Sequence, residues 1–121
     1  MSTEATDKSV PLRDRLRTAL SAAMKTRDRS AIAGLRSVLG AIDNAEAIDT
    51  VDINAGAIET SAVGLGAAEA RRRHLTESDI EQIVRTEIAD RHKVADEYDT
   101  LGRSDHGHLL RAEAAALTAQ L

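Results

Sequence analysis

The residues best suited to metal chemistry lie together near the carboxyl end, where Asp105, His106 and His108 fall within four residues. Imidazole and carboxylate groups are good ligands for zinc or nickel. The sequence offers no further ligand at a suitable spacing, because His74 and His92 are isolated and no HExxH pattern is present. There is also no cysteine to supply a thiolate. We therefore interpret these side chains as exposed residues near a helix start and expect no metal site.

Residues that could bind a phosphate in a tight turn, or act as a nucleophile, lack the context that such chemistry needs. Gly64 and Gly66 form a GxG pattern, but no strand precedes it and no third glycine follows at the required spacing. Serine and histidine occur, yet nothing arranges a nucleophile, a base and an orienting group. We predict no catalytic residue and no cofactor, and we do not expect this chain to be an enzyme by itself.

Carboxylates are plentiful between residues 76 and 102, where acid–base chemistry is one interpretation and surface ion pairing is another. Two pairs have the favoured i, i+4 order, Glu81 with Arg85 and Glu87 with Arg91. Such pairs stabilise a solvated helix by a few tenths of a kcal/mol. We favour surface ion pairs, because paired acids that do chemistry also need a pocket.

Two groups of cations are the best candidates for binding an anion, and they stand out in a chain whose net charge is −4. One is Lys25, Arg27 and Arg29, and the other is Arg71, Arg72 and Arg73. Flexible cations on exposed elements are the usual contacts to nucleic-acid phosphates. The chain has one Tyr and no Phe or Trp, so these cations have no aromatic residues among them on which bases could stack. Solvated charge and nucleic-acid contact both remain open here, and we expect no binding of DNA.

These residues are positioned by helices, of which the clearest is a long one from Thr76 to Gly102. Thr76 and Asp79 have capping-box spacing, and Gly102 stands where a helix ends. Positions three and four apart predict one face that packs against the rest of the chain. They are Ile80, Ile83, Val84, Glu87, Ile88, Arg91, Ala95, Tyr98 and Leu101. We expect the ring of Tyr98 to be buried on this face.

Three further helices complete the predicted all-α domain of residues 10–121. The first runs from about Pro11 to Thr26, and a short link that lets Asp28 or Ser30 cap the second makes these two an antiparallel hairpin. Gly34 and Gly40 inside the second helix predict close approach of a neighbouring helix. Ser104 or Asp105 is expected to cap an Ala-rich last helix. We expect residues 1–9 to be a disordered tail and 49–75 to be a long loop, with a short helix near 67–72 as one alternative.

Four segments, in this order, resemble proteins of the GatB/YqeY family. They are residues 16–29, 35–47, 83–103 and 112–121. The matched positions that we expect to fix the helices together are Leu35, Asn44, Glu87, Arg91, Glu97, Tyr98 and Gly102. The resemblance covers the family's N-terminal helical module, and we expect the family's smaller C-terminal domain to be absent. The family has a shorter connection where this chain has residues 49–75, so the resemblance assigns no role to these residues.

The resemblance implies an all-helical fold similar to part of the tail of the GatB component of the glutamine-dependent aminoacyl-tRNA amidotransferase. That enzyme is a carbon–nitrogen ligase with glutamine as amido-N-donor; its tail is associated with tRNA recognition, and its chemistry lies elsewhere. We therefore expect a non-catalytic module that associates with tRNA or with an amidotransferase-like protein. The alternative is a structural module for protein–protein interaction or self-association, as a homo-oligomer, without RNA binding.

The first ten residues are polar and lack the apolar run of a secretory signal. The sequence also has no stretch of about 20 apolar residues, the length that a membrane span requires. We expect a cytoplasmic protein with no membrane association.

Overall fold

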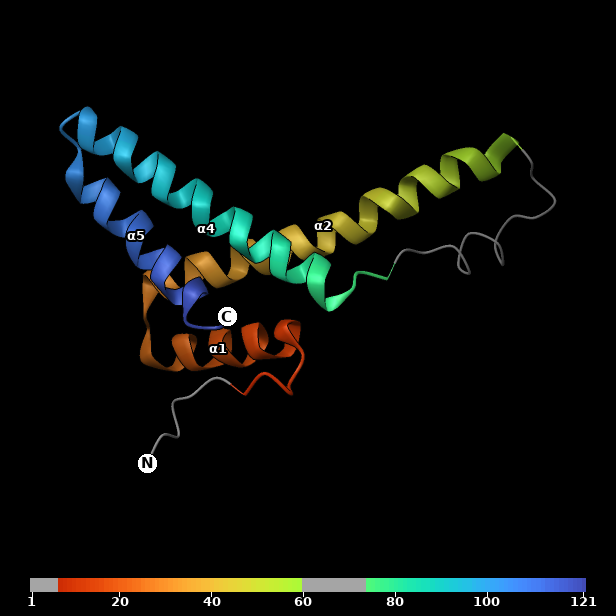
Figure 1. Ribbon diagram of the computed structural model, residues 1–121, viewed down its shortest axis with the longest axis horizontal. Helices are drawn as coiled ribbons and strands as arrows, with labels where there is room; N and C mark the ends of the chain where they lie inside the picture. The colour runs from red at the N-terminus through yellow and green to blue at the C-terminus, as the bar shows by residue number, and fades with distance from the viewer. Residues whose placement is uncertain (1–6, 60–73) are drawn as a thin grey trace.

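The computed structural model describes residues 7–59 and 74–121, and of residues 48–59 only the backbone. This part of the chain contains four helices and no strand, which confirms the all-α prediction. The helices are α1 (Leu12–Thr26), α2 (Arg29–Glu59), α4 (Glu77–Thr100) and α5 (Ser104–Thr118) (Figure 1).

The helices form two hairpins that pack across each other (Figure 1). α1 and α2 run antiparallel, as the short link predicts, and α4 and α5 run side by side in opposite directions. The α4–α5 hairpin lies over the first half of α2, whose second half continues away from the other helices. The site candidates on α1 and on the first half of α2 therefore belong to the packed part of the molecule.

The core is made of aliphatic side chains alone, as the near-absence of aromatic residues requires. Every helix contributes to it, with Leu16, Val38, Val84 and Leu117 completely buried. The remaining buried apolar residues are Leu12, Ala23, Ala31, Leu35, Ile42, Ile80, Ala95 and Ala114. Leu101, predicted on the apolar face of the long helix, is instead 71% exposed, because α4 ends at Thr100 and the chain turns away.

Polar groups at the helix ends explain where α2 and α4 begin. The Thr76 hydroxyl accepts from the Asp79 amide at 3.0 Å, and the Asp79 carboxylate accepts from the Thr76 amide at 3.0 Å, so the predicted capping box is confirmed. Asp28 accepts from the Ala31 amide at 3.2 Å, as predicted for the start of α2. Both contacts satisfy amides that the first helical turn leaves open.

The end of α4 follows the prediction, whereas the start of α5 does not. Gly102 adopts φ +74°, the left-handed conformation that commonly ends a helix. The predicted cap of α5 by Ser104 or Asp105 is wrong: its N-cap is Arg103, and no side chain caps it. The Asp105 carboxylate accepts from the adjacent His106 amide at 2.9 Å instead.

The prediction of a loop over residues 49–75 is wrong for residues 49–59, because α2 continues to Glu59. Residues 49–59 contain no proline, and their single interior glycine costs a helix only about 1 kcal/mol relative to alanine. Residues 60–73 lie outside the described part of the chain, and with them Gly64, Gly66, the suggested short helix and Arg71 to Arg73. Of the predicted tail, residues 7–9 are described; there the Asp7 carboxylate accepts from the Ser9 amide at 2.9 Å.

The two glycines of α2 differ in what surrounds them. A Cβ atom at Gly34 would lie 3.1 Å from the Glu113 carbonyl oxygen and 3.2 Å from the Glu113 Cβ on α5, so the predicted close approach is confirmed. A Cβ atom at Gly40 would meet nothing within 4 Å, so the same prediction is wrong there. Gly34 marks a close crossing of α2 and α5, and Gly40 lies on the exposed face.

Candidate nucleic-acid interface

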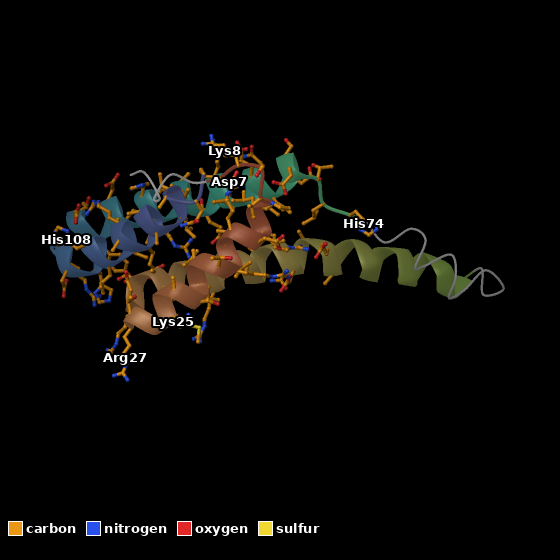
Figure 2. All side chains as sticks on the ribbon, turned by 90° about the horizontal axis from the view of Figure 1, so that it is seen from below. Asp7, Lys8, Lys25, Arg27, His74 and His108 are labelled. Atoms are coloured by element: carbon orange, nitrogen blue, oxygen red, sulfur yellow. The ribbon has the colours of Figure 1, made fainter. Side chains whose placement is uncertain are left out.

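The first predicted group of cations lies where α1 turns into α2. Lys25 is in the last turn of α1, Arg27 is its C-cap, and Arg29 is the first residue of α2. All three residues are exposed. Lys25 and Arg27 project from the end of α1, on the side opposite Asp7 and Lys8 (Figure 2). We call Lys25, Arg27 and Arg29 the α1–α2 corner.

Backbone contacts and one aspartate build this corner, so the cations are not needed to hold it. Arg27 adopts the left-handed conformation with φ 57°, which ends α1. Its amide donates to the Met24 carbonyl at 3.3 Å, and the Asp28 amide donates to the Ala23 carbonyl at 3.0 Å. The Asp28 carboxylate then caps α2. The charged side chains are left to point into solvent.

Arginines elsewhere in the described ranges are mostly neutralised by acids on the same or a neighbouring helix. These pairs are Arg13 with Glu46, Arg17 with Asp14, Arg85 with Glu81, Arg91 with Glu87 and Glu113, and Arg111 with Asp96 and Asp99. Within the residues described, the three corner cations make no such ion pair. The single acid beside them, Asp28, is engaged as the α2 cap. The corner thus presents positive charge that no side chain of the described structure neutralises.

A fourth cation, Arg36, extends this surface along α2, although the sequence does not group it with the corner. It is exposed and has no ion pair in the described part of the chain. Arg36 follows Arg29 by seven residues, which is two helical turns, so both lie on the same face of α2. Its sequence signal is the helical i, i+7 spacing from Arg29, because no cation lies nearer to it along the chain.

The carboxylates that the sequence considered for chemistry are held in structural contacts. Glu81 and Arg85 pair at 2.9 Å, and Glu87 and Arg91 pair at 2.8 Å, as predicted. Arg91 also binds Glu113 of α5 at 3.0 Å. Burial lowers the pKa of Arg91, but hydrogen bonds to both glutamates and their negative charges outweigh it, so that this pKa is raised. Arg91 therefore ties α4 to α5 as a permanent cation.

An open groove of about 410 Å³ lies between α2 and the first half of α4. Its lining residues are Ala41, Ala45, Leu75, Asp79, Gln82, Ile83, Thr86 and Glu87. Its two carboxylates are both engaged, Asp79 in the capping box and Glu87 with Arg91. Both carboxylates therefore take part in contacts that hold the fold.

Tyr98 is half-buried and lies within a small cluster at the tip of the α4–α5 hairpin. Its ring centre is 5.0 Å from that of His106, and the Arg103 guanidinium carbon lies 5.7 Å from the Tyr98 centroid. His106 also approaches Asp105 at 3.9 Å. In residues 7–59 and 74–121, no three or more potential metal ligands come together.

The other positions that carry the family resemblance divide between the core and the surface. Leu35 is 1% exposed and lies in the core. Asn44 and Glu97 are exposed on α2 and α4. Gly102 occupies the left-handed position after α4.

Comparison with models of known protein families, with curated proteins and with solved structures finds no match. The resemblance to the GatB/YqeY family thus stays a prediction. None of the helices within the described ranges is both long and apolar enough to cross a bilayer.

Proposed function

We propose that this chain is a non-catalytic helical module of the GatB/YqeY type that binds tRNA through the α1–α2 corner. In this role it serves an amidotransferase-like protein, a carbon–nitrogen ligase with glutamine as amide donor, whose chemistry lies outside this chain. The sequence resemblance supports the family and the partner. The observation that carries the binding surface is that Lys25, Arg27 and Arg29 are exposed and unneutralised, whereas most other described arginines are paired.

Unpaired cations bind phosphate at lower cost than paired ones, because no internal ion pair has to break. The net charge of −4 gives no long-range attraction for RNA, so binding depends on the local contacts. Three phosphate contacts predict that affinity falls with salt with a log–log slope of about 2 to 3, which is roughly 20- to 40-fold between 50 and 200 mM. The complex should therefore be weak at physiological salt and clear at low salt.

The test is fluorescence anisotropy with labelled tRNA at low salt, using a corner variant with Lys25→Glu, Arg27→Glu and Arg29→Glu. A control variant carries the same three charge reversals at exposed positions elsewhere, Arg17→Glu, Arg85→Glu and Lys93→Glu. We expect the corner variant to lose binding and the control to keep most of it. Absence of binding by the wild-type chain, or equal loss in both variants, would overturn the proposal.

The second cluster, Arg71 to Arg73, is proposed as an additional contact on the basis of the sequence. A variant with all three changed to Glu tests it separately in the same assay. A further drop in affinity would place these residues in the interface, and unchanged binding would remove them from it.

Exposed apolar residues favour a second candidate function, a module for protein–protein interaction or self-association. Leu101 is 71%, Leu109 55% and Met24 49% exposed. The open groove between α2 and α4 adds an apolar floor formed by Ala41 and Ile83, among others. Light scattering over a range of protein concentrations tests self-association, and a strict monomer throughout would refute it.

A further inference from the structure

We infer that the α1–α2 corner and Arg36 together recognise the phosphate backbone of a double-helical RNA stem in preference to a flexible single strand. This inference rests on the proposed function and specifies the form of RNA that the same surface takes. It is carried by the placement of Arg29 and Arg36 on one face of α2, by the lack of any aromatic ring among the cations, and by their uncompensated charge.

The spacing of Arg29 and Arg36 is fixed by α2. Seven residues correspond to about 10.5 Å along the helix axis and to directions that differ by only about 20°. Both face away from the buried side of α2, on which Leu35 and Val38 lie. Two cations on one face of a helix can contact phosphates of the same strand at the regular spacing that a duplex already holds. A flexible single strand must lose conformational freedom to present phosphates at that spacing.

The chemistry of the surface excludes the usual source of single-strand affinity. Proteins that bind single strands gain about 1–3 kcal/mol for each base stacked on an aromatic ring. Tyr98 is the only Phe, Tyr or Trp in the chain, and it is half-buried between His106 and Arg103 on the α4–α5 hairpin. No such residue lies between Lys25 and Arg36 in the sequence. The surface can therefore contribute charge and hydrogen bonds to phosphates, but no stacking.

The number of phosphate contacts gives the expected size of the preference for duplex over single-stranded RNA. Lys25, Arg27, Arg29 and Arg36 are opposed locally by Asp28, which leaves an excess of three positive charges. Each phosphate contact contributes about 0.9 to the salt slope for a B-form DNA duplex, a value we adopt for the RNA duplex, and about 0.7 for a single strand. Four contacts then predict slopes of about 3.6 and 2.8, and this difference makes the duplex roughly tenfold tighter at about 50 mM salt if other terms are equal.

The experiment compares a blunt RNA duplex with each of its separated strands, using the full chain and fluorescence anisotropy over a series of salt concentrations. We expect the duplex to bind about tenfold more tightly at about 50 mM salt. Arg36→Ala should lower the duplex slope by about one unit. Arg85→Ala, which removes an exposed arginine from α4, is the matched control and should leave the slope unchanged. Circular dichroism establishes that both variants remain folded.

The outcomes separate this inference from the function on which it rests. Equal affinity for duplex and single strands, with tRNA binding still lost in the corner variant, would overturn the duplex preference alone. A slope that Arg36→Ala leaves unchanged would remove Arg36 from the surface. No binding of any RNA by the wild-type chain would overturn both proposals.

Discussion

The crossing of α2 and α5 can be tested by adding one methyl group at two positions of the same helix. Gly34→Ala places a Cβ atom 3.1 Å from the backbone oxygen of Glu113, whereas Gly40→Ala places it in open space. Both substitutions, within α2, replace glycine by alanine, the residue with the highest helix propensity. The two variants therefore share the change in helix propensity and differ in the tertiary contact.

Whether each substitution stabilises or destabilises the protein depends on the gain in helix propensity and on the cost of overpacking. Replacing an interior glycine by alanine stabilises a helix by about 0.5–1 kcal/mol. Gly40→Ala should gain this amount in full. At Gly34 the neighbour is backbone that cannot rotate away, and overpacking of this kind costs about 1–3 kcal/mol. We expect Gly34→Ala to be destabilised by about 1 kcal/mol, and the two variants to differ by roughly 2 kcal/mol.

Urea unfolding followed by circular dichroism measures both free energies against the wild type. The midpoint should rise for Gly40→Ala and fall for Gly34→Ala, with the slope of the transition unchanged. If Gly34→Ala proved as stable as Gly40→Ala, the close packing of α2 on α5 would be refuted. If Gly40→Ala were destabilising, the assignment of that position to an open helix face would be refuted.

Two further predictions concern ion pairs. Arg91→Met should destabilise the fold by about 2 kcal/mol, which is less than the roughly 3–5 kcal/mol for breaking a fully buried pair, because the two glutamate partners keep some hydration. In the same urea assay the exposed control Arg85→Met should cost below about 0.5 kcal/mol. Equal costs for the two variants would contradict this account. The hydrogen bond from Arg111 lowers the pKa of Asp99. Desolvation opposes this shift, and the positive charge of Arg111 adds to it. The pair's small contribution to stability is therefore present above about pH 4 and lost as the pH falls through the lowered pKa. NMR titration should show that Arg111→Gln raises this pKa toward its ordinary value, and an unchanged titration would refute the contact.

The elements that local chemistry determines could be predicted from the sequence. The boundaries of α1 and α4 follow from Pro11, the Thr76–Asp79 capping box and Gly102, since each acts within one helical turn. The extent of α2 was not predicted, because Asp49, Thr50, Asp52 and Gly56 are poor helix formers and obscure the helical spacing of Ile48, Val51, Ala55 and Ile58. A helix that has already formed nevertheless propagates through such residues at little cost. Gly34 and Gly40 show the same limit: their types are identical, and only the position of α5 distinguishes them.

Only the part of the candidate site that is local in the sequence could be predicted. Cations close in the sequence can be recognised as a cluster, and Lys25, Arg27 and Arg29 were. Which cations remain unneutralised depends on pairs formed across helices, such as Arg13 with Glu46, which are 33 residues apart, and Arg91 with Glu113, which are 22 apart. The local pairs, such as Glu81 with Arg85 and Glu87 with Arg91, could be predicted from their i, i+4 spacing. The pairs across helices could not, because no local pattern reveals their partners, and so the sequence did not show which cations would stay without an ion pair.

This distinction also gives a way to separate a functional surface from a structural one. Arg91 is retained by the fold, since its loss would leave two half-buried glutamates unpaired. The α1–α2 corner is built by backbone hydrogen bonds and by Asp28, so its cations contribute nothing visible to the packing. Lys25→Glu and Arg27→Glu put negative charge at the C-terminus of α1, which costs about 0.3–1 kcal/mol each, whereas Arg29→Glu at the N-terminus of α2 gains a similar amount. Reversing all three charges should therefore lower the free energy of unfolding by no more than about 1 kcal/mol. Loss of tRNA binding with stability lowered by no more than this would identify the corner as a binding surface, whereas a larger loss of stability would show that the cations belong to the fold.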